Sequence, residues 1–466
     1  MIQHPHQRPR LLNQLLLHIK SPILLYDHLL NMYGPKELFQ FFFLELNYVK
    51  MIIIVVGGNV KKIYILLIGV FIALLIIFLF NAYDNQKETY MINLGEKSID
   101  EIKEYSRDYG LNLEIVEEYS ETVEKGKVIS QNILEQQEIN VGDTLIVHIS
   151  LGKLDKDIYK EYDVNELGNV PIMMYHGIHN VAETNYVGGN VDKDGYQRTA
   201  NAFRNDLEFY YNSGYRMISL SDYVEGKIDV ELGKSPIILT FDDGLANNIL
   251  VTGLDQDGEI IIDPNSAVGI LEDFKNNYPD FNVTATFFIN GGLFGQPEYN
   301  EKIIKWLIDN GYSIGNHSYN HVDLSNTSKD KTMMEIGSIY NVLESIIPGE
   351  YDKIVALPFG SPYVESADSF SYILSGNYQG INYETVSTLR VGWESELSPF
   401  NKYFNKSFLK RIRAYDNNGT EFDIEMNFKI LETTRYISDG NVDTIVVPEI
   451  KKENISNKND YKIITY

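Results

Sequence analysis

The sequence predicts an α/β protein in which a large domain built on a parallel sheet follows a smaller α+β module. From residue 170 onward, short apolar runs alternate with helical stretches. This order is typical of parallel β/α folds, either open or closed into a barrel. Between residues 91 and 152, one helical stretch precedes several strand-like segments, which indicates a separate unit. With 466 residues, 44% of them hydrophobic, the chain can form both cores.

Charge and cysteine content exclude several classes of protein. The chain has no cysteine, so disulfides, thiolate metal ligands and cysteine nucleophiles are all excluded. Any metal must therefore bind to His, Asp or Glu. The net charge of −25 argues against nucleic-acid binding. The charge is uneven, because residues 1–62 carry seven Lys or Arg against three Asp or Glu, and the rest carries 33 against 62.

A hydrophobic segment follows this basic N-terminal part. Residues 63–80 read IYILLIGVFIALLIIFLF, which is close to the length needed to span a bilayer. We expect a transmembrane anchor over 63–82, a cytoplasmic leader over 1–62 and an extracellular C-terminal part, because two lysines precede the segment. These features predict a single-pass protein of the cell membrane. A buried core helix and a cleaved signal peptide are the alternatives. We expect Met51 to be the true first residue of the protein, and we therefore assign no function to residues 1–50.

The small module over 91–152 has a recognisable order of elements. Ser98 and Glu101 form the S-x-x-E pattern of a capping box, and the helix that they begin should end at Gly110. Strands are expected around 113–116, 127–131 and 144–150. This order, with the segments VISQ, VGD and ISLGK, resembles a PASTA repeat. The resemblance implies a cell-wall setting, with peptidoglycan binding or a spacer role as alternatives. The charged segment 153–169 is predicted to be a linker.

The large domain is expected over 170–450, with a polar tail over 451–466. Apolar strands are predicted at 171–175, 236–241 and 285–289, and an amphipathic helix at 301–310. In parallel β/α folds, functional residues gather where strands end and loops begin. Residues 245–267 look like an insertion, either a neutral surface loop or a segment that shapes a binding site.

Titratable side chains follow three of the expected strands. Asp242 and Asp243 come directly after an apolar run. His317 and His321 are four residues apart, so they share one face if the segment is helical. Two imidazoles and one carboxylate, with a fourth position left for water, form a hydrolytic zinc site. His176 follows the first strand. The alternatives are a surface turn for Asp242 and Asp243, ordinary packing for His317 and His321, and a turn histidine for His176.

The segments TFDDG, ATFFI, GYSIGNHSYNH and LPFG occur in this order. They resemble the polysaccharide deacetylases of carbohydrate esterase family four, the NodB-homology domain. The resemblance implies a distorted parallel β/α barrel and metal-dependent hydrolysis of N-acetyl groups. It also implies that Asp243, His317 and His321 bind a divalent metal ion and that Asp242 is the general base. Zinc is the expected ion, with cobalt, nickel and iron as alternatives.

Two features depart from that family. Its third motif usually reads Arg-Pro-Pro-Tyr-Gly, but here Ala356 replaces the arginine, and no histidine follows His321. The segment PIMMYHGI resembles the opening strand of the circularly permuted deacetylases, which implies that His176 is the general acid. LKRI resembles their LPRI strand, so Arg411 could replace the lost arginine. The residues expected to contact substrate are Trp393, Pro358 and Phe359.

The predicted function is that of a membrane-anchored, extracytoplasmic hydrolase of non-peptide amide bonds. It would remove N-acetyl groups from a cell-wall or surface polysaccharide, with peptidoglycan favoured over poly-N-acetylglucosamine because of the PASTA-like module. A non-catalytic wall-binding protein on a deacetylase scaffold is the main alternative, given the two departures. A non-haem iron oxygenase is a further alternative, because two histidines and a carboxylate also form that iron site.

Overall fold

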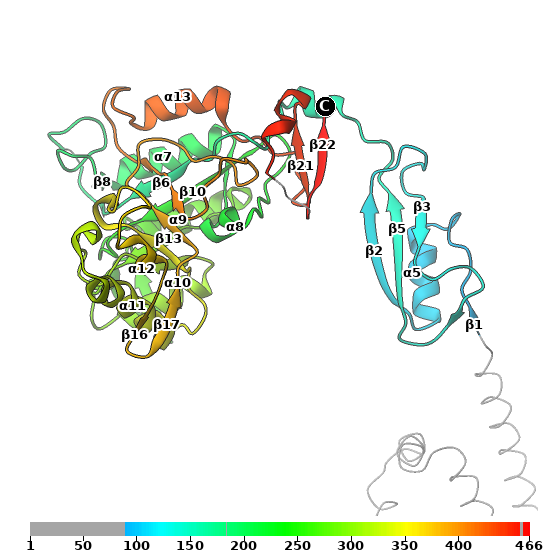
Figure 1. Cartoon of the computed structure of the whole chain (residues 1–466), viewed down its shortest axis with the longest axis horizontal. Coiled ribbons are helices and arrows are strands. Elements are labelled where there is room, and N and C mark those ends of the chain that lie inside the picture. The colour runs from blue at the N-terminus through cyan, green and yellow to red at the C-terminus, as the bar shows by residue number, and fades with distance from the viewer. Residues whose placement is uncertain (1–88, 183, 457–459) are drawn as a thin grey trace, which may run out of the picture. The chain divides into compact units, whose positions relative to one another are not determined.

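The computed structural model describes residues 89–182, 184–456 and 460–466 (Figure 1). These residues form two compact units, and the boundary falls between Leu154 and Asp155. The expected leader and anchor, over 1–62 and 63–82, lie outside the described residues. Within the described part of the chain, no helix is both long and apolar enough to span a membrane.

The smaller unit packs one helix on a three-stranded sheet. Helix α5 (Ile99–Asp108) begins at the predicted capping box, in which the Ser98 side chain accepts from Glu101 N–H and Glu101 accepts from Ser98 N–H. The strand order is β2-β5-β3, with β2 and β5 parallel. The bounds are β2 (Asn112–Glu118), β3 (Val128–Gln131), β5 (Thr144–Ser150) and the small pair β1 (Thr89–Tyr90) and β4 (Glu138–Ile139). This is the predicted order of helix and strands.

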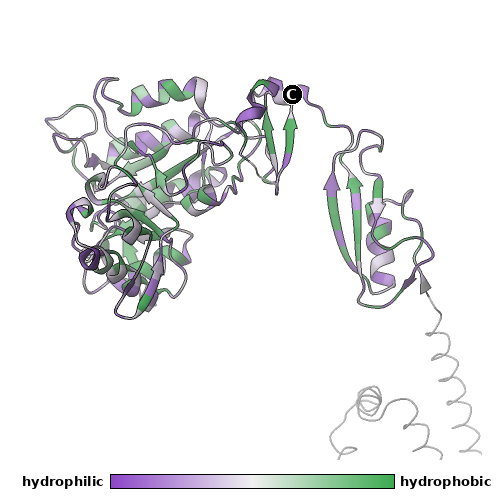
Figure 2. Cartoon of the chain, viewed as in Figure 1, coloured by the Kyte–Doolittle hydropathy of each residue, from purple (hydrophilic) through white to green (hydrophobic). Residues whose placement is uncertain are grey.

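The core of this unit is its own. Ile102 from α5 and Leu145 and Val147 from β5 are completely buried and belong to one cluster that contains only residues of this unit. Buried and more exposed residues alternate along β5 from Thr144 to Ile149, and much of the strand has the green colour of apolar residues (Figure 2). The sheet therefore buries one face against the helix.

The larger unit is built on a nine-stranded sheet in which every pair of neighbours is parallel. The strands are β6 (Ile172–Tyr175), β9 (Tyr215–Met217), β10 (Ser235–Phe241), β13 (Thr286–Ile289), β14 (Ser313–Asn316), β15 (Ile354–Ala356), β18 (Ser387–Leu389), β19 (Phe408–Leu409) and β20 (Ile412–Arg413). The order is β19-β18-β15-β14-β13-β10-β6-β20, with β9 also paired to β10. The two end strands β19 and β20 are separated in the chain by Lys410 and Arg411 alone, so the sheet curls. The predicted α/β class with a parallel sheet is confirmed.

Helices cover this sheet, so its strands are buried on both faces. Every residue of β10 is buried, which explains why the strand appears in the sequence as an unbroken apolar run. The longer helices are α7 (Ala200–Asn212), α9 (Ala267–Asn277), α10 (Asn300–Asp309), α11 (Lys329–Ile346) and α13 (Ile424–Thr434). Shorter elements are α8 (Leu220–Glu225), α12 (Phe370–Leu374) and the strand pairs β7 (Ile178–His179) with β8 (Arg198–Thr199), β11 (Val251–Leu254) with β12 (Ile260–Ile262), and β16 (Ser375–Tyr378) with β17 (Ile381–Glu384).

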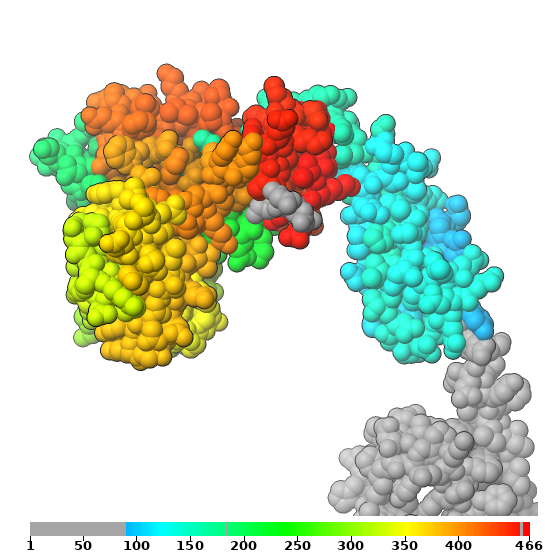
Figure 3. All heavy atoms as spheres, viewed as in Figure 1, coloured from blue at the N-terminus to red at the C-terminus, as the bar shows by residue number. Residues whose placement is uncertain are grey.

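The expected linker and tail are both more ordered than the sequence indicated. Residues 155–169 belong to the larger unit, form α6 (Asp157–Glu161) and bury Val164 and Leu167. In the tail, β22 (Lys462–Thr465) pairs with β21 (Thr444–Val447) and buries Ile464. Figure 3 shows this C-terminal segment, in red, against the surface of the same unit. Both segments pack on the larger unit through a few buried apolar residues, although most of their residues are polar or charged.

Candidate active site

The candidate metal ligands come from the carboxyl ends of neighbouring strands. Asp243 lies two residues beyond β10, and His317 directly follows β14, which is separated from β10 by β13. The segment from His317 to His321 is not helical, contrary to the conditional expectation, because Ser318 and His321 have φ values of +57° and +51°. The two rings still meet, with centroids 4.8 Å apart, because the chain turns back after the strand.

Three side chains converge on one point. Asp243 Oδ1 lies 3.4 Å from His317 Nε2 and 3.3 Å from His321 Nε2. The three ligand atoms lie within 4.8 Å of one another. His317 is buried, whereas Asp243 and His321 are partly exposed, so the cluster is open to solvent on one side. Two imidazoles and a carboxylate with an accessible side fit a divalent cation that keeps a position for water.

Contacts behind the ligands fix their orientation. His317 Nδ1 lies 2.8 Å from the carbonyl oxygen of Ala356 and donates to it, which leaves Nε2, 3.4 Å from Asp243 Oδ1, as the nitrogen that could bind a metal ion. Buried Glu335 accepts from the backbone N–H and the side-chain amide of Asn320 at 2.7 and 2.9 Å, which holds the loop before His321. Ala356, which stands where an arginine was expected, thus orients His317 through its backbone carbonyl.

Asp242 and Arg411 form a buried bidentate ion pair. The two terminal nitrogens of Arg411 lie 2.7 Å from the two carboxylate oxygens of Asp242, and the exposed fractions of the residues are 0% and 2%. Arg411 also donates to Thr240 Oγ1 at 3.2 Å and to the Arg390 carbonyl at 2.8 Å. Burial would raise the pKa of Asp242, but the charge of Arg411 outweighs it and holds this pKa below its usual value. Asp242 is therefore ionised at neutral pH.

His176 follows β6 beside this pair. Its carbonyl accepts from the Asn248 side chain at 2.7 Å, and its ring meets that of Tyr196 edge to face at 5.1 Å. Burial lowers the pKa of His176, and the charges of Asp242 and Asp243 act against that shift. Among the described residues, its buried Nδ1 has no hydrogen-bond partner.

The neighbouring histidine is engaged elsewhere. His179 Nε2 lies 3.0 Å from Gln197 Oε1, so the structure gives the two histidines of this segment different surroundings.

The residues expected to contact substrate differ in accessibility. Phe359 is 56% exposed, and its ring lies 4.7 Å from that of His321. Trp393 is 62% exposed and lines two cavities of about 280 and 360 Å³. Pro358 is buried, so Phe359 is the residue of this motif that a ligand can reach.

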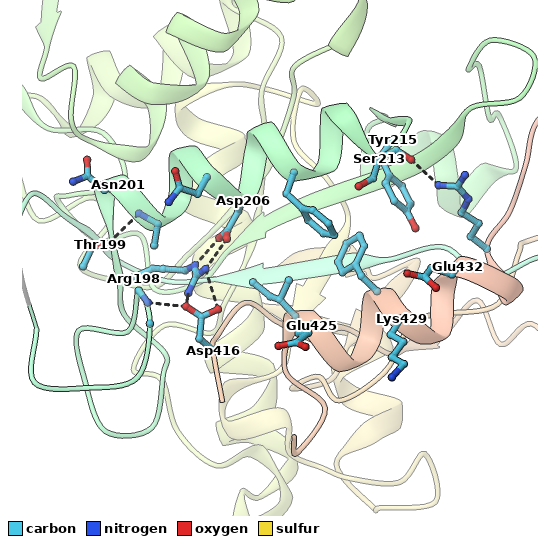
Figure 4. A pocket seen from close by; sticks show the side chains of 18 residues that line it. Arg198, Thr199, Asn201, Asp206, Ser213, Tyr215, Asp416, Glu425, Lys429 and Glu432 are labelled. Atoms are coloured by element: carbon cyan, nitrogen blue, oxygen red, sulfur yellow. Dashed lines mark hydrogen bonds and ion pairs between the residues drawn. The ribbon is translucent and has the colours of Figure 1, made fainter. Parts of the chain in front are cut away.

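A cavity of about 970 Å³ lies between α7 and α13 and contains none of these residues (Figure 4). Its buried charges are already paired, because Arg198 binds both oxygens of Asp206 at 2.5 Å and also Asp416 at 3.1 Å. Asp206 also accepts from Tyr175 Oη at 3.0 Å. Since Tyr175 precedes His176, this network supports the strand end that carries the candidate acid.

Family models match part of the larger unit and most of the described part of the smaller one. Residues 229–372 match the family model for polysaccharide deacetylases, and residues 89–151 match that for the PASTA domain. The chain carries a polysaccharide deacetylase domain and a PASTA domain. The match to the deacetylase model begins after His176 and ends before Arg411, so the assignment of these two residues depends on geometry.

Two curated relatives are similar to the deacetylase domain. The peptidoglycan-N-acetylmuramic acid deacetylase PdaA of Bacillus subtilis is 30% identical over 132 residues, which is 28% of this chain and 46% of PdaA. A chitin deacetylase of Arthroderma benhamiae is 27% identical over 124 residues, 26% of this chain and 27% of that protein. The chain thus matches less than half the length of either relative.

Two solved structures are also similar. The Streptococcus pyogenes deacetylase PplD in complex with acetate has a TM-score of 0.40 at 18% identity, and the match covers 57% of this chain and 99% of PplD. The peptidoglycan deacetylase PdaC of Bacillus subtilis has a TM-score of 0.20 at 25% identity, with 29% of this chain and 52% of PdaC covered.

Several parts of the site were not found from the sequence. Thr240, Asn248, Tyr196 and the Ala356 carbonyl all contact predicted site residues. Thr240 and Asn248 had a signal, because the first opens the TFDDG segment and the second follows it closely. The others act through tertiary contacts or backbone atoms that no sequence motif records.

Proposed function

We propose that the protein is a metal-dependent deacetylase that hydrolyses N-acetyl groups of a cell-wall glycan, with peptidoglycan as the favoured substrate and poly-N-acetylglucosamine as the alternative. The observation that carries this proposal is the ionised Asp242–Arg411 pair beside the Asp243, His317 and His321 cluster. A PASTA domain on the same chain and the similarity to PdaA, a peptidoglycan-N-acetylmuramic acid deacetylase, favour a peptidoglycan substrate.

Each residue has a separate task in the hydrolysis. Asp243, His317 and His321 would hold the divalent ion, which when bound polarises the acetamide carbonyl and lowers the pKa of water. Asp242 accepts a proton from the attacking water, and Arg411 keeps this carboxylate ionised and oriented.

The leaving group needs a proton as the C–N bond breaks, because an amine anion leaves poorly. His176 is our proposed donor to the sugar nitrogen. The products are acetate and the free amino sugar, so one water molecule is consumed for each acetyl group removed. Phe359 and Trp393 would contact the sugar through their exposed rings.

The competing reading is a non-catalytic wall-binding protein. It gives no reason for a buried arginine aligned on both oxygens of Asp242, since binding a glycan requires no ionised base. An iron oxygenase would likewise need the two histidines and Asp243 but not this second carboxylate.

Acetate release tests the proposed activity. The full chain, loaded in turn with zinc, cobalt, nickel or iron, should release acetate from peptidoglycan or from chito-oligosaccharides and lose this activity with a chelator. Asp242→Asn is the matched variant, and it should abolish turnover while the bound metal remains. If the loaded protein binds wall glycan but releases no acetate from either substrate, the non-catalytic reading is correct.

We also propose that residues 63–82 anchor the protein in the cell membrane, with the deacetylase domain outside. Protease added to intact cells should then digest the domain. Digestion only after lysis would reverse the proposed orientation.

A further inference from the structure

Two arginines stand apart from the others in the described chain. Arg107, Arg198, Arg216 and Arg411 form ion pairs, and Arg204 and Arg435 donate to backbone carbonyls. The guanidinium groups of Arg390 and Arg413 contact aromatic rings and have no hydrogen bond or ion pair among the described residues. Free arginines are unexpected in a protein with 65 acidic and 40 basic residues.

Arg413 is held in place by two aromatic rings. Its guanidinium carbon lies 3.9 Å from the ring centre of Tyr415 and 5.0 Å from that of Tyr196. Such stacking uses the faces of the guanidinium plane, so the N–H groups at its edge stay available. The side chain is partly exposed, so a ligand can reach these donors.

Arg413 lines a cavity that also includes Tyr196, a neighbour of His176. It has a volume of about 360 Å³, and Trp393, Phe422 and Tyr196 are among the residues that line it. The Tyr196 ring contacts the His176 ring at 5.1 Å. The lining carboxylate, Glu421, accepts from the Asn417 amide at 3.2 Å and forms no ion pair with Arg413.

The second free arginine, Arg390, lines another cavity to which Trp393 also contributes. Arg390 lines the adjacent cavity of about 280 Å³ with Trp393, Phe422 and Lys410. Lys410 is already paired with Glu394 at 2.9 Å. Trp393 therefore has an arginine with free donors in each of the cavities beside it.

We infer that Arg413 binds an anionic substituent of the glycan, a carboxylate or a phosphate, while the acetamido group occupies the metal site. This inference rests on the proposed function and adds to it a preference for acidic glycans. An arginine with fixed orientation and free N–H groups suits bidentate binding of either anion. The exposed ring of Trp393 gives the adjacent sugar an apolar surface.

Four substrates test the inference on the metal-loaded full chain. They are a neutral chito-oligosaccharide, an N-acetylmuramic acid-containing oligosaccharide with free lactyl carboxylates, the same glycan as its methyl ester, and a phosphate-bearing N-acetylglucosamine oligomer. We expect an acidic glycan to be preferred and Arg413→Gln to lower its kcat/KM about tenfold, with the neutral substrate changed less than twofold. Whichever acidic glycan is preferred shows whether Arg413 binds a carboxylate or a phosphate.

Matched variants separate charge from folding. Arg204→Gln removes the same charge from α7, where the guanidinium binds the Pro264 carbonyl, and should leave the preference intact. Arg413→Lys should restore part of the preference, because it keeps the charge but loses the bidentate geometry. Equal loss on acidic and neutral substrates in Arg413→Gln would overturn the inference.

A binding measurement distinguishes failure of this inference from failure of the proposed activity. Calorimetry with de-N-acetylated acidic and neutral oligosaccharides requires no turnover. Tighter binding of the acidic glycan, lost in Arg413→Gln, would support the anion site even if no substrate released acetate. If the protein releases acetate but binds acidic and neutral oligosaccharides equally well, the anion site is overturned and the proposed deacetylase activity stands.

Discussion

Asp242 depends on a residue that is 169 positions away in the sequence, and this dependence makes Arg411 the most sensitive position of the site. Arg411→Met leaves a buried carboxylate without its counter-charge, so we expect a loss of about 3–5 kcal/mol in the free energy of unfolding. Arg411→Lys should lose less stability and lower kcat, because a lysine cannot hold both oxygens of Asp242. Urea denaturation and steady-state kinetics measure the two effects, with Arg204→Lys as the control. Unchanged kcat in Arg411→Lys would contradict the positioning role.

His176 and His179 offer a matched pair at the same scale. Replacing the proposed acid in His176→Gln should lower kcat by about two orders of magnitude and leave the metal content unchanged. His179→Gln should have a mild effect, because that ring binds Gln197. Metal analysis and acetate release measure both variants. Near-normal turnover in His176→Gln would transfer the acid role to another group.

The metal cluster gives a third prediction for single residues. His321→Ala removes one of three ligands, so metal and activity should be lost together, and added zinc should not restore full occupancy. The substitution lies on a partly exposed loop, so the fold should persist. Stoichiometric metal in this variant would show that the ion binds elsewhere.

Sequence patterns predicted individual residues and strands better than the elements between them. The strands before Asp242 and His176 were visible as apolar runs because both faces of each are buried. The His317 to His321 segment misled because spacing alone suggests a helix, whereas positive φ angles turn the chain there. Arg411 was indicated by family resemblance alone, since the contact that explains it is tertiary. The expected linker and tail were not predicted to pack on the larger unit, because only a few of their residues are apolar and buried.

Helix and strand packing also creates a buried acid far from the site. Asp352 accepts from Ser221 at 2.5 Å and from Thr286 at 3.3 Å, and burial raises its pKa to about 6. The pKa of an unfolded aspartate is about 3.9. Between these values the folded chain keeps a proton that the unfolded chain releases, so the free energy of unfolding falls as the pH rises from about 4 to 6.

This acid predicts a stabilising substitution. Asp352→Asn cannot ionise, so it should be more stable than the wild type by about 3 kcal/mol above pH 6 and equal to it below pH 4. Urea denaturation across this range measures the difference, and Asp257→Asn, in an exposed turn, is the control. A constant difference at all pH values would mean that Asp352 does not titrate in this window.

For the whole molecule, the separate cores predict separable functions. The clusters of buried residues in the smaller unit include none from the larger one. A chain that begins at residue 155 should therefore keep its kcat on soluble oligosaccharides within about twofold. Its activity on insoluble wall material should fall if the PASTA domain binds that material. Loss of activity on the soluble substrate would make the smaller unit part of the catalytic machinery.

The curl of the sheet has a consequence for how activity appears during biosynthesis. Strands β19 and β20 lie at opposite ends of the strand order, yet the two residues between them include Arg411. The arginine can reach Asp242 only when both ends have been laid against their neighbours. A chain that ends before residue 411 has the aspartate and histidines of the metal cluster but lacks the arginine that pairs with Asp242. The Asp242–Arg411 ion pair therefore forms only after the last of the nine strands of this sheet has been made, and until then the carboxylate of Asp242 is neither held in place nor paired with a positive charge.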